Sequence, residues 1–570
     1  MSKIETSTET HITEETEPLP EPPSHALQEL DIDEPNAPVR TKLRTWAILL
    51  ALYLSLFVTA LDQTIVATAI PVITSDLGSA AGYFWIGGAF LLANAAAAPI
   101  WAKVSDIFGR KPVLLGAVAL FAVGSTLAAT SVSMSMLIAA RALQGTAGGG
   151  ILQLVSIVIS DLFSMRSRTL YFGLIEVTWA LAGGIGPIVG GAFTQLVSWR
   201  WCFWINLPIA GTTFIILIFF LNVHNPRTPL RSGLSAIDWY GTASILGVML
   251  MLLLGLDFGG VTFPWSSPTV ICLIVFGVVM IAVLVVSETK IAEYPIIPIS
   301  VFRNWSNVAA FAVTFCQGLV FIGGEFYLPL YFQSVRGAEP LRSGLLLIPL
   351  ALSEAAAGCF SGLLIHQTGR YREMMWVGTI LMTLGYGLFI MFDATTPIRD
   401  IIGIELIAGI GAGLLFQPPL VAVQVMVSQA DTATATATVG TARNLATAIS
   451  VVLGGIIFQN GMDSRISSLR AAGLNSTLIS DFSDGHAAAN VEVIKHIADA
   501  AQQRAVKDAF SWSLRNVWIT YTVAAGLGFV VSVFVKHRDL SSEHTETRTG
   551  IEEMTKRPRV APASDEAAAL

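Results

Sequence analysis

Long apolar segments, separated by short polar ones, run along most of the chain. A helix needs about 20 apolar residues to cross a hydrocarbon layer of about 30 Å, and about fourteen segments approach this length. The predicted spans are Trp46–Ala69, Phe84–Ala102, Val113–Ala129, Met136–Ile159, Tyr171–Val197, Phe203–Leu221, Trp239–Leu256, Val270–Ser287, Val308–Leu330, Gly344–Ile365, Met374–Phe392, Ile401–Val425, Val439–Phe458 and Val517–Val535. Because backbone groups in lipid must be paired within the segment, these spans are expected to be helices. The pattern predicts an all-α polytopic membrane protein.

Composition supports this class and leaves only the two ends polar. The 570 residues are 53% hydrophobic and 13% charged, about half the ~25% charge content of soluble domains. Residues 1–44 and 537–570 are poor in apolar residues and are predicted to be disordered tails. The first tail lacks the apolar core of a signal peptide. The four cysteines lie singly, which indicates neither a disulfide framework nor a metal site, and no cofactor is expected.

The basic residues set the predicted orientation, because cytoplasmic loops of membrane proteins carry more lysine and arginine. With the N-terminus inside, the short outer loops hold Arg200, Arg336, Arg342 and Arg399. The cytoplasmic side then holds Arg40, Lys42, Arg44, Lys103, Arg110, Lys111, Arg166, Arg168, Arg227, Arg231, Lys290, Arg303, Arg370, Arg372, Lys536 and Arg538. Both termini are therefore predicted to be cytoplasmic. The segment 460–511 becomes an extracellular loop, with an accessible glycosylation sequon at Asn475.

Two motifs occur once in each half of the chain. The sequence AKVSDIFGRK at Ala102–Lys111 aligns with GLLIHQTGRY at Gly362–Tyr371, and GTAGGGILQ at Gly145–Gln153 aligns with GIGAGLLFQ at Gly409–Gln417. Internal repeats of this kind are typical of transporters built from two related halves.

The repeat predicts a domain organisation of two six-helix halves. The N-terminal half covers 45–222 and the C-terminal half 305–536. The linker 223–304 contains the two spans that have no counterpart, which we predict to form an inserted two-helix hairpin.

A stretch of small residues, TWALAGGIGPIVGG, lies at 178–191 within one span. Both of its rows are expected on one nearly bare helix face. These rows are Thr178, Ala182, Gly186 and Gly190, and beside them Gly183, Pro187 and Gly191. Small faces let helix backbones approach closely, and a proline within a helix removes one donor and favours a bend. The spacing fits either static packing or a contact that moves.

A charged turn with the residues Asp106, Gly109, Arg110 and Lys111 follows the second span. An acid there can accept from the N-terminus of a nearby helix, and an arginine can bridge acids across the seam between the halves. Such contacts hold one state and break in the other, so the turn is predicted to be a latch. The alternative is ordinary positive-inside charge.

Charged residues also lie within the apolar spans, where they normally mark a pathway or an ion pair. Asp62 and Arg141 are the first two of these residues. A proton carrier needs a group that can be charged or neutral, and the Asp62 carboxylate is such a group. Arginine cannot release its proton and can only bias a neighbouring acid or hold an anion. Glu354, near the middle of its span, is a second proton candidate. Other charges within spans are Glu176, Glu325, Glu405 and Arg443, of which Glu325 and Glu405 lie near outer ends and fit a wet position equally well.

An amphipathic substrate cavity is a further hypothesis. Its predicted lining is Trp179, Glu325, Phe326 and Tyr327. The pair Gly323-Gly324 is expected to break the helix there and admit a substrate. The alternative is that these aromatics form an interfacial belt.

Several catalytic and energy-coupling motifs are absent from the sequence. It has no G-x-x-x-x-G-K-[ST] phosphate loop and no H-E-x-x-H set. We therefore expect neither an ATP motor nor an enzyme. An ion gradient, worth about 2.3 kcal/mol per charge per 100 mV, is the expected energy source.

Taken in order, the motifs resemble those of the fourteen-span drug:proton antiporters of the major facilitator superfamily, particularly fungal toxin and multidrug efflux pumps. The resemblance covers roughly Thr45 to Val535. It rests on LDQTIVATAIPVI with Asp62, AKVSDIFGRK, RALQGTAGG with Arg141, GPIVGG and WRWCFWINLPI. The chain departs from the family pattern where Ala102, Thr178 and Ala182 replace glycine.

The resemblance implies the major facilitator fold and export by alternating access, with protons exchanged for substrate. By this analogy Asp62 serves proton coupling or substrate contact and Arg141 tunes the proton. The Asp106–Arg110 turn latches the outward state, and the glycine face becomes a sliding or sealing contact. The expected partners are the lipid bilayer, protons and a small-molecule substrate, without nucleic acid, for a monomer in the plasma membrane. A nutrient or siderophore carrier, or a vacuolar transporter, is the alternative.

Overall fold

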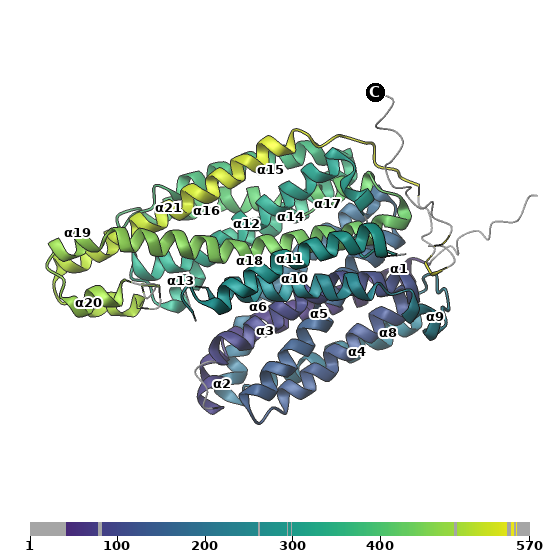
Figure 1. Ribbon diagram of the computed structural model, residues 1–570, viewed down its shortest axis with the longest axis horizontal. Coiled ribbons are helices and arrows are strands. Elements are labelled where there is room, and N and C mark those ends of the chain that lie inside the picture. The colour runs from purple at the N-terminus through teal and green to yellow at the C-terminus, as the bar shows by residue number, and fades with distance from the viewer. Residues whose placement is uncertain are drawn as a thin grey trace, which may run out of the picture. The chain divides into compact units, whose positions relative to one another are not determined.

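A computed structural model describes residues 41–570 except 78–81, 260–262, 293, 298, 484–486, 489, 544–548, 552–554 and 556–570. Almost all of the N-terminal tail predicted at 1–44 therefore lies outside the described residues, as does much of the C-terminal tail. The described chain is helical throughout its apolar segments (Figure 1).

The N-terminal half contains eight described helices. They are α1 (Lys42–Ala67), α2 (Ile70–Asp76), α3 (Gly82–Phe108), α4 (Arg110–Ala129), α5 (Met134–Leu162), α6 (Met165–Leu196), α7 (Trp201–Trp204) and α8 (Asn206–Phe220). The linker follows with α9 (Leu230–Ser235), α10 (Trp239–Phe258), α11 (Pro268–Val286), η1 (Ser287–Ile291) and η2 (Ile299–Phe302).

The C-terminal half contains the remaining described elements. They are α12 (Trp305–Ser334), α13 (Pro340–Leu346), α14 (Ile348–Thr368), α15 (Tyr371–Phe389), α16 (Ile398–Gly413), α17 (Pro418–Val425), η3 (Gln429–Asp431), α18 (Thr432–Ser464), α19 (Ile466–Ala471), α20 (Ser476–Asp481), η4 (Val491–His496) and α21 (Ala500–Ser532).

Thirteen helices of the described chain are long and apolar enough to cross a membrane. The remaining predicted span, Met374–Phe392, coincides with α15, which packs between α16 and α21. The prediction of an all-α polytopic membrane protein is therefore confirmed.

The two halves repeat the same packing, as the sequence motifs predicted. In the N-terminal half, Gly145 and Gly149 of α5 lie directly on the backbone of α3. In the C-terminal half, the aligned Gly409 and Gly413 of α16 lie on the backbone of α14. A side chain at any of the four positions would overlap the facing backbone, so the glycines permit close helix approach in both halves.

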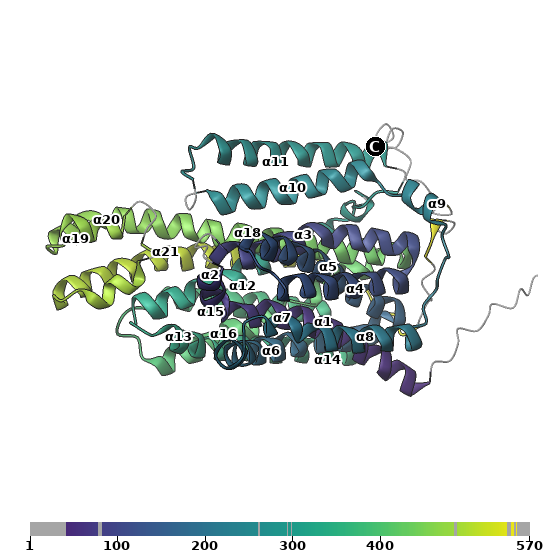
Figure 2. The same ribbon diagram turned by 90° about the horizontal axis from the view of Figure 1, so that it is seen from below.

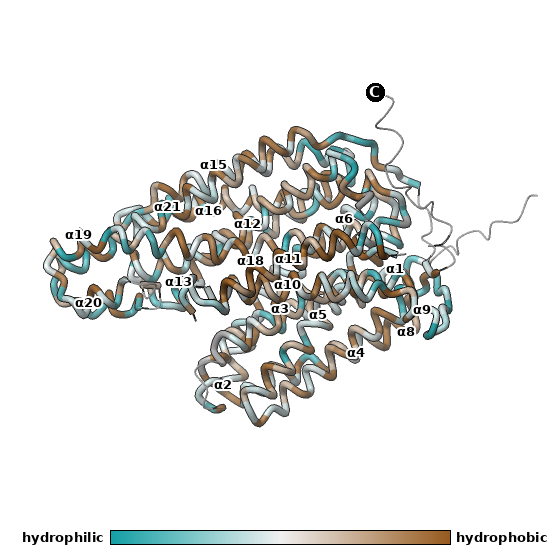
Figure 3. Tube along the Cα trace, viewed as in Figure 1, coloured by the Kyte–Doolittle hydropathy of each residue, from teal (hydrophilic) through white to brown (hydrophobic). Residues whose placement is uncertain are grey.

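The inserted hairpin lies against both halves. Its helices α10 and α11 pack on each other, and α10 also contacts α3 and α18 (Figure 2). Apolar residues predominate along both helices (Figure 3), and many side chains of α11 are exposed. Such a surface suits contact with lipid.

The loop predicted at 460–511 is largely helical. α18 and α21 each have 33 residues, about 50 Å at 1.5 Å per residue, which exceeds the ~30 Å of the hydrocarbon layer. Between them lie α19, α20 and η4, and Leu469, Phe482 and Phe510 of this region belong to the apolar core of the C-terminal half. The span boundaries at Phe458 and Val517 were too narrow because polar residues continue these helices beyond the apolar stretch.

The prediction of disorder after Lys536 needs correction for the described part of that tail. Arg538 N donates a hydrogen bond to Tyr371 Oη over 2.9 Å, and Leu540 is buried in the core of the C-terminal half. These contacts order a segment whose polar composition carries no such signal.

Candidate functional site

A buried ion pair joins α1 to α5 inside the N-terminal half. The Asp62 carboxylate pairs with Arg141 Nη1, and the two side chains are 0% and 2% exposed. Gln144 Nε2 on α5 donates to Asp62 Oδ1 over 3.0 Å, and Asn206 Nδ2 on α8 donates to the same oxygen over 2.7 Å. Asp62 thus accepts from three donors. These donors lie on α5 and α8, so Asp62 joins α1 to both helices.

Arg141 has further partners around its guanidinium. Its Nε donates to Ile86 O over 3.0 Å, and its Nη1 donates to Gln144 Oε1 over 3.0 Å. The Phe90 ring centroid lies 4.5 Å from its Cζ. A buried charge is tolerated only when it is paired and hydrogen-bonded, and here it is both. Asp62 and Arg141 therefore belong to one site, whose role in proton coupling stays a prediction.

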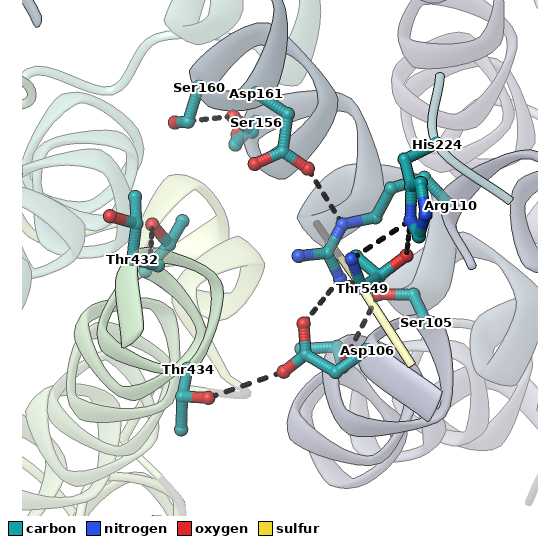
Figure 4. A network of polar contacts seen from close by, with 12 residues as sticks. Ser105, Asp106, Arg110, Ser156, Ser160, Asp161, His224, Thr432, Thr434 and Thr549 are labelled. Atoms are coloured by element: carbon teal, nitrogen blue, oxygen red, sulfur yellow. Dashed lines mark hydrogen bonds and ion pairs between the residues drawn. The ribbon is translucent and has the colours of Figure 1, made fainter. Parts of the chain in front are cut away.

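A second buried charge cluster lies toward the other end of α5 (Figure 4). Arg110, in the first turn of α4, bridges two carboxylates. Its Nη1 lies 2.6 Å from Asp106 Oδ1 and its Nε lies 2.7 Å from Asp161 Oδ2. The expectation that Arg110 bridges acids across the seam needs correction, because both acids belong to the N-terminal half. Asp161, at the end of α5, supplies the second carboxylate locally.

Glycine is required at the turn that positions Arg110. Gly109 has φ +94°, a conformation that side chains rarely adopt. A Cβ at Gly109 would also lie 2.9 Å from Pro226 Cδ. The aligned Gly369 also has a positive φ, +74°, but its ψ is 0° whereas that of Gly109 is 155°, so the repeat keeps the glycine and not the exact backbone conformation of the turn. Lys111 points elsewhere, and its Nζ donates to Ile218 O over 2.7 Å.

Asp106 is the member of this cluster that reaches the C-terminal half. Thr434 Oγ1 on α18 donates to Asp106 Oδ2 over 3.5 Å (Figure 4). Close by, Gln424 Nε2 donates to Ser160 Oγ over 3.2 Å. A small apolar cluster also spans the seam, with the members Ala102, Ile157, Ala433 and Ala437.

The contact between α6 and α14 belongs to the same end of the molecule. Arg166 Nε donates to His366 O over 2.7 Å, and a Cβ at Gly173 would lie 3.1 Å from Cys359 O. Toward their other ends the same helices carry exposed apolar side chains, among them Leu181, Ile188 and Leu352. We call the contacting region, formed by the ends of α3, α5 and α14 and the starts of α6 and α18, the closed seam.

Four charged residues from both halves gather beside the closed seam. Glu354 on α14 lies within electrostatic reach of Glu176 on α6, Glu325 on α12 and Arg443 on α18. A Cβ at Gly358 would lie 2.7 Å from Glu176 Cγ, so that glutamate packs against α14 across the seam. Four segments far apart in sequence therefore place three acids and one base together. The proton role of Glu354 stays a prediction.

The position of Glu405 differs from the sequence-based expectation that it lies near an outer helix end in contact with water. Its side chain is 0% exposed, and its two oxygens have no hydrogen-bond partner among the described residues. It lies two turns into α16, on the buried face that carries Ile401 and Ala408. Glu405 is buried because it lies on the inward face of α16, although it is close to the end of the predicted span.

One row of the small-residue face on α6 packs against α1. The buried row is Thr178, Ala182, Gly186 and Gly190. A Cβ at Gly186 would overlap Thr64, and Thr64 Oγ1 donates to Ala182 O over 2.9 Å. Because α1 and α6 share a half, this face does not contact the opposite half in this conformation.

The second row of that face needs correction. Pro187 is exposed, and a Cβ at Gly183 or Gly191 would meet nothing within 4 Å. Consecutive residues lie about 100° apart around a helix, which turns the second row away from α1. In this conformation Pro187 and Gly191 therefore lie on an open face of α6, whereas Gly186 and Gly190 pack against α1.

The predicted cavity residues do not share one environment. Phe326 is exposed, whereas Tyr327 is 2% exposed and donates to Val451 O inside the C-terminal half. Trp179 packs against an apolar cluster of the other half. Tyr327 is thus a core residue in this conformation, which corrects its assignment as a cavity wall.

The expected helix break at Gly323-Gly324 is also wrong. α12 continues through both glycines from Trp305 to Ser334. A Cβ at Gly323 would overlap the Tyr521 ring, and one at Gly324 would overlap Tyr386 Oη. The pair therefore makes room for two tyrosines instead of an entrance.

Several site residues escaped the sequence reasoning. Gln144 lies in the quoted fourth-span motif, and its place three residues after Arg141 could have suggested a partner. Asp161 and Thr434 carry no motif signal. No group of three or more His, Cys, Asp or Glu suited to hold a metal occurs among the residues that the structure describes.

The sequon residue Asn475 is exposed at the start of α20. Its Oδ1 accepts from Leu478 N over 2.8 Å and from Thr477 Oγ1 over 2.9 Å. The oxygen caps the helix, whereas glycosylation would use Nδ2. Modification of Asn475 stays a prediction.

A membrane-embedded bundle of two repeated helical halves, with buried charges beside the seam, is the architecture of a membrane transporter. The family model described as Major Facilitator Superfamily matches residues 52–451. The chain belongs to this family and is a transporter of it.

Relatives from fungi cover nearly the whole chain. The efflux pump dotC of Dothistroma septosporum is 47% identical over 89% of this chain and 87% of that protein. The MFS-type transporter ppz2 of Metarhizium majus is 43% identical over 91% of this chain and 89% of that protein. The efflux pump FUS6 of Gibberella fujikuroi is 33% identical over 95% and 96%.

Solved structures share the fold at low sequence identity. The proton:xylose symporter XylE, bound to 6-bromo-6-deoxy-D-glucose, has a TM-score of 0.56 and 13% identity, over 90% of this chain and 99% of its own. The human organic anion transporter MFSD10 has a TM-score of 0.55 and 17% identity, over 85% of this chain and 99% of its own. These similarities establish the fold alone.

Proposed function

We propose that the protein exports amphipathic small organic molecules, such as a toxin, a secondary metabolite or an antifungal drug, in exchange for protons. The observation that carries the proposal is that relatives aligned over most of the chain, at 47% and 33% identity, are named efflux pumps. The proposed location is the plasma membrane with both termini cytoplasmic, since the basic residues favour that orientation.

With this orientation the closed seam is cytoplasmic. The contacts of Asp106, Ser160 and Arg166 with the C-terminal half then close the inner side. The exposed apolar residues of α6 and α14 lie toward the outside. The conformation is accordingly proposed to be the outward-facing one, and rocking of the halves would open the seam.

Two sites are proposed to couple protons to this motion. Asp62 on α1 accepts from Gln144 on α5 and Asn206 on α8, so a proton that neutralises its carboxylate would weaken the interactions that join these helices. Glu354 lies among charges of both halves, so a proton there changes the electrostatic interaction across the seam. A nutrient or siderophore carrier on the same fold is the alternative, and a vacuolar membrane is the alternative location.

The direction of transport can be tested by intracellular accumulation of a panel of fungicides and fungal toxins, in cells with and without the protein. Export predicts lower accumulation of at least one compound when the protein is present, with loss of the difference when a protonophore collapses the pH gradient. Higher accumulation in the presence of the protein would contradict export and favour the carrier alternative.

A further inference from the structure

We propose that the chain after the last membrane helix is a strap that holds the closed seam together. The C-terminal strap consists of the two described segments 536–543 and 549–551. It rests on the alternating access proposed above, because only a transporter whose halves separate has a seam to hold.

The start of the strap is fixed to the C-terminal half. Lys536 N donates to Ser306 Oγ over 3.0 Å, and Arg538 N donates to Tyr371 Oη over 2.9 Å. Tyr371 Oη in turn donates to Lys536 O over 3.0 Å. Leu540 then inserts into the apolar core of this half with 9% exposure. These contacts anchor the strap before it reaches the other half.

The following residues reach the N-terminal half on the other side of the seam. Arg166 N, in the first turn of α6, donates to Ser541 O over 3.2 Å. Further on, Gly550 N donates to Asp106 O over 2.8 Å. Asp106 is also the residue whose carboxylate meets Arg110 and Thr434 (Figure 4). The strap therefore ends on the residue that joins the two halves.

The end of the strap is closely packed. Thr549 N donates to His224 Nδ1 over 3.1 Å, and Thr549 is 5% exposed (Figure 4). Gly550 has φ +115°, and a Cβ there would overlap Pro226 Cβ. A glycine is therefore required for this fit, which marks the contact as a shaped site and not a loosely lying tail.

The strap connects the two halves of the transporter at the closed seam. Because the strap is fixed to both halves, the halves cannot part at the closed seam until its hydrogen bonds to Arg166, Asp106 and His224 break. Three hydrogen bonds, two of them between backbone groups and one from Thr549 N to the His224 ring, are together expected to shift the balance between closed and open seam at least about tenfold, at about 0.5 kcal/mol or more each. Release of the strap should therefore favour opening of the seam.

The test measures seam opening in the full-length protein. Ser160→Cys places a thiol at the closed seam, where Ser160 is 1% exposed, in a background whose four native cysteines are alanines. Gly550→Val should detach residues 549–551, which removes two of the three hydrogen bonds, and raise the rate of N-ethylmaleimide labelling roughly fivefold. Ser542→Val introduces the same side chain at an exposed strap residue and should leave the rate unchanged.

Two deletions test the strap in case Gly550→Val alone does not release it. Deletion of 541–570 removes every strap contact to the N-terminal half, whereas deletion of 556–570 leaves them. The first should label at least as fast as Gly550→Val and the second like the parent. If neither Gly550→Val nor the longer deletion is labelled more than twofold faster than its control, the proposal that the strap holds the seam closed is refuted. Labelling needs no substrate and no proton gradient, so this result is independent of whether export is proton-coupled.

Discussion

Replacement of Asp62 by asparagine is the most informative single change in the buried ion pair. From the sequence alone, Asp62→Asn is expected to abolish pH-driven transport in a protein that remains folded and inserted. The structure adds a cost in stability, because Arg141 loses its counterion while it stays buried at 2% exposure. Its remaining acceptors, Ile86 O and Gln144 Oε1, carry no full charge.

The size of this cost follows from the burial of both partners. Removal of one member of a buried ion pair costs about 3–5 kcal/mol, a large part of the roughly 5–15 kcal/mol that stabilises a typical domain. Arg141→Gln should cost a similar amount. The double variant Asp62→Asn/Arg141→Gln should lose less than the sum of the two, by about 1–3 kcal/mol, since the two charges are removed together.

The assay is unfolding of purified protein in detergent, with the four members of the cycle compared under one condition. Asp76→Asn is the matched control, because Asp76 pairs with Arg200 over 3.4 Å at the surface, where such a pair contributes at most about 1 kcal/mol. If Asp62→Asn unfolds like Asp76→Asn, the pair does not stabilise the fold. Normal pH-driven flux in Asp62→Asn would move the coupling role to Glu354.

Three further changes test other parts of the structure. Gly186→Leu should lower the free energy of unfolding by about 1–3 kcal/mol and block transport, since the new side chain must enter the space of Thr64. Gly183→Leu on the same helix has open space around it and should behave like the parent protein. Equal behaviour of the two variants would refute the packing role of Gly186. Glu354→Gln should abolish pH-driven flux in inverted vesicles without loss of folded protein; flux at the parental rate would remove Glu354 from the coupling mechanism. Asn475→Gln should lower the apparent mass by one glycan on electrophoresis, and an unchanged mass would place the sequon on the cytoplasmic side or leave it unused.

Periodic and repeated features could be predicted from the sequence. The apolar spans, the duplicated glycine motifs and the hairpin each leave a regular pattern, and the structure reproduces them. The pairing of Asp62 with Arg141 was also within reach, because lone charges within apolar spans need a partner and these two share one half.

Contacts set by tertiary packing could not be predicted in the same way. Asp161 meets Arg110 across 51 sequence positions, and nothing in its neighbourhood distinguishes it from any acid at a helix end. Gly323-Gly324 looks the same in sequence whether it breaks a helix or makes room for Tyr521 and Tyr386. The strap is the extreme case, because a polar tail has the composition of a disordered segment while its backbone atoms make the contacts.

α5 links the two buried charge clusters that these experiments address. Arg141 lies near one end of this helix and Asp161 near the other, twenty residues apart along a continuous element, which is about 30 Å. Gly145 and Gly149 fix α5 against the backbone of α3, the helix that carries Asp106 in its last turn and ends at Phe108. We propose that any shift of α5 caused by protonation of Asp62 acts along this helix on Asp161, Arg110 and Asp106, where the seam and the strap meet. The site beside Asp62 and the closed seam are in this sense the two ends of one packed pair of helices.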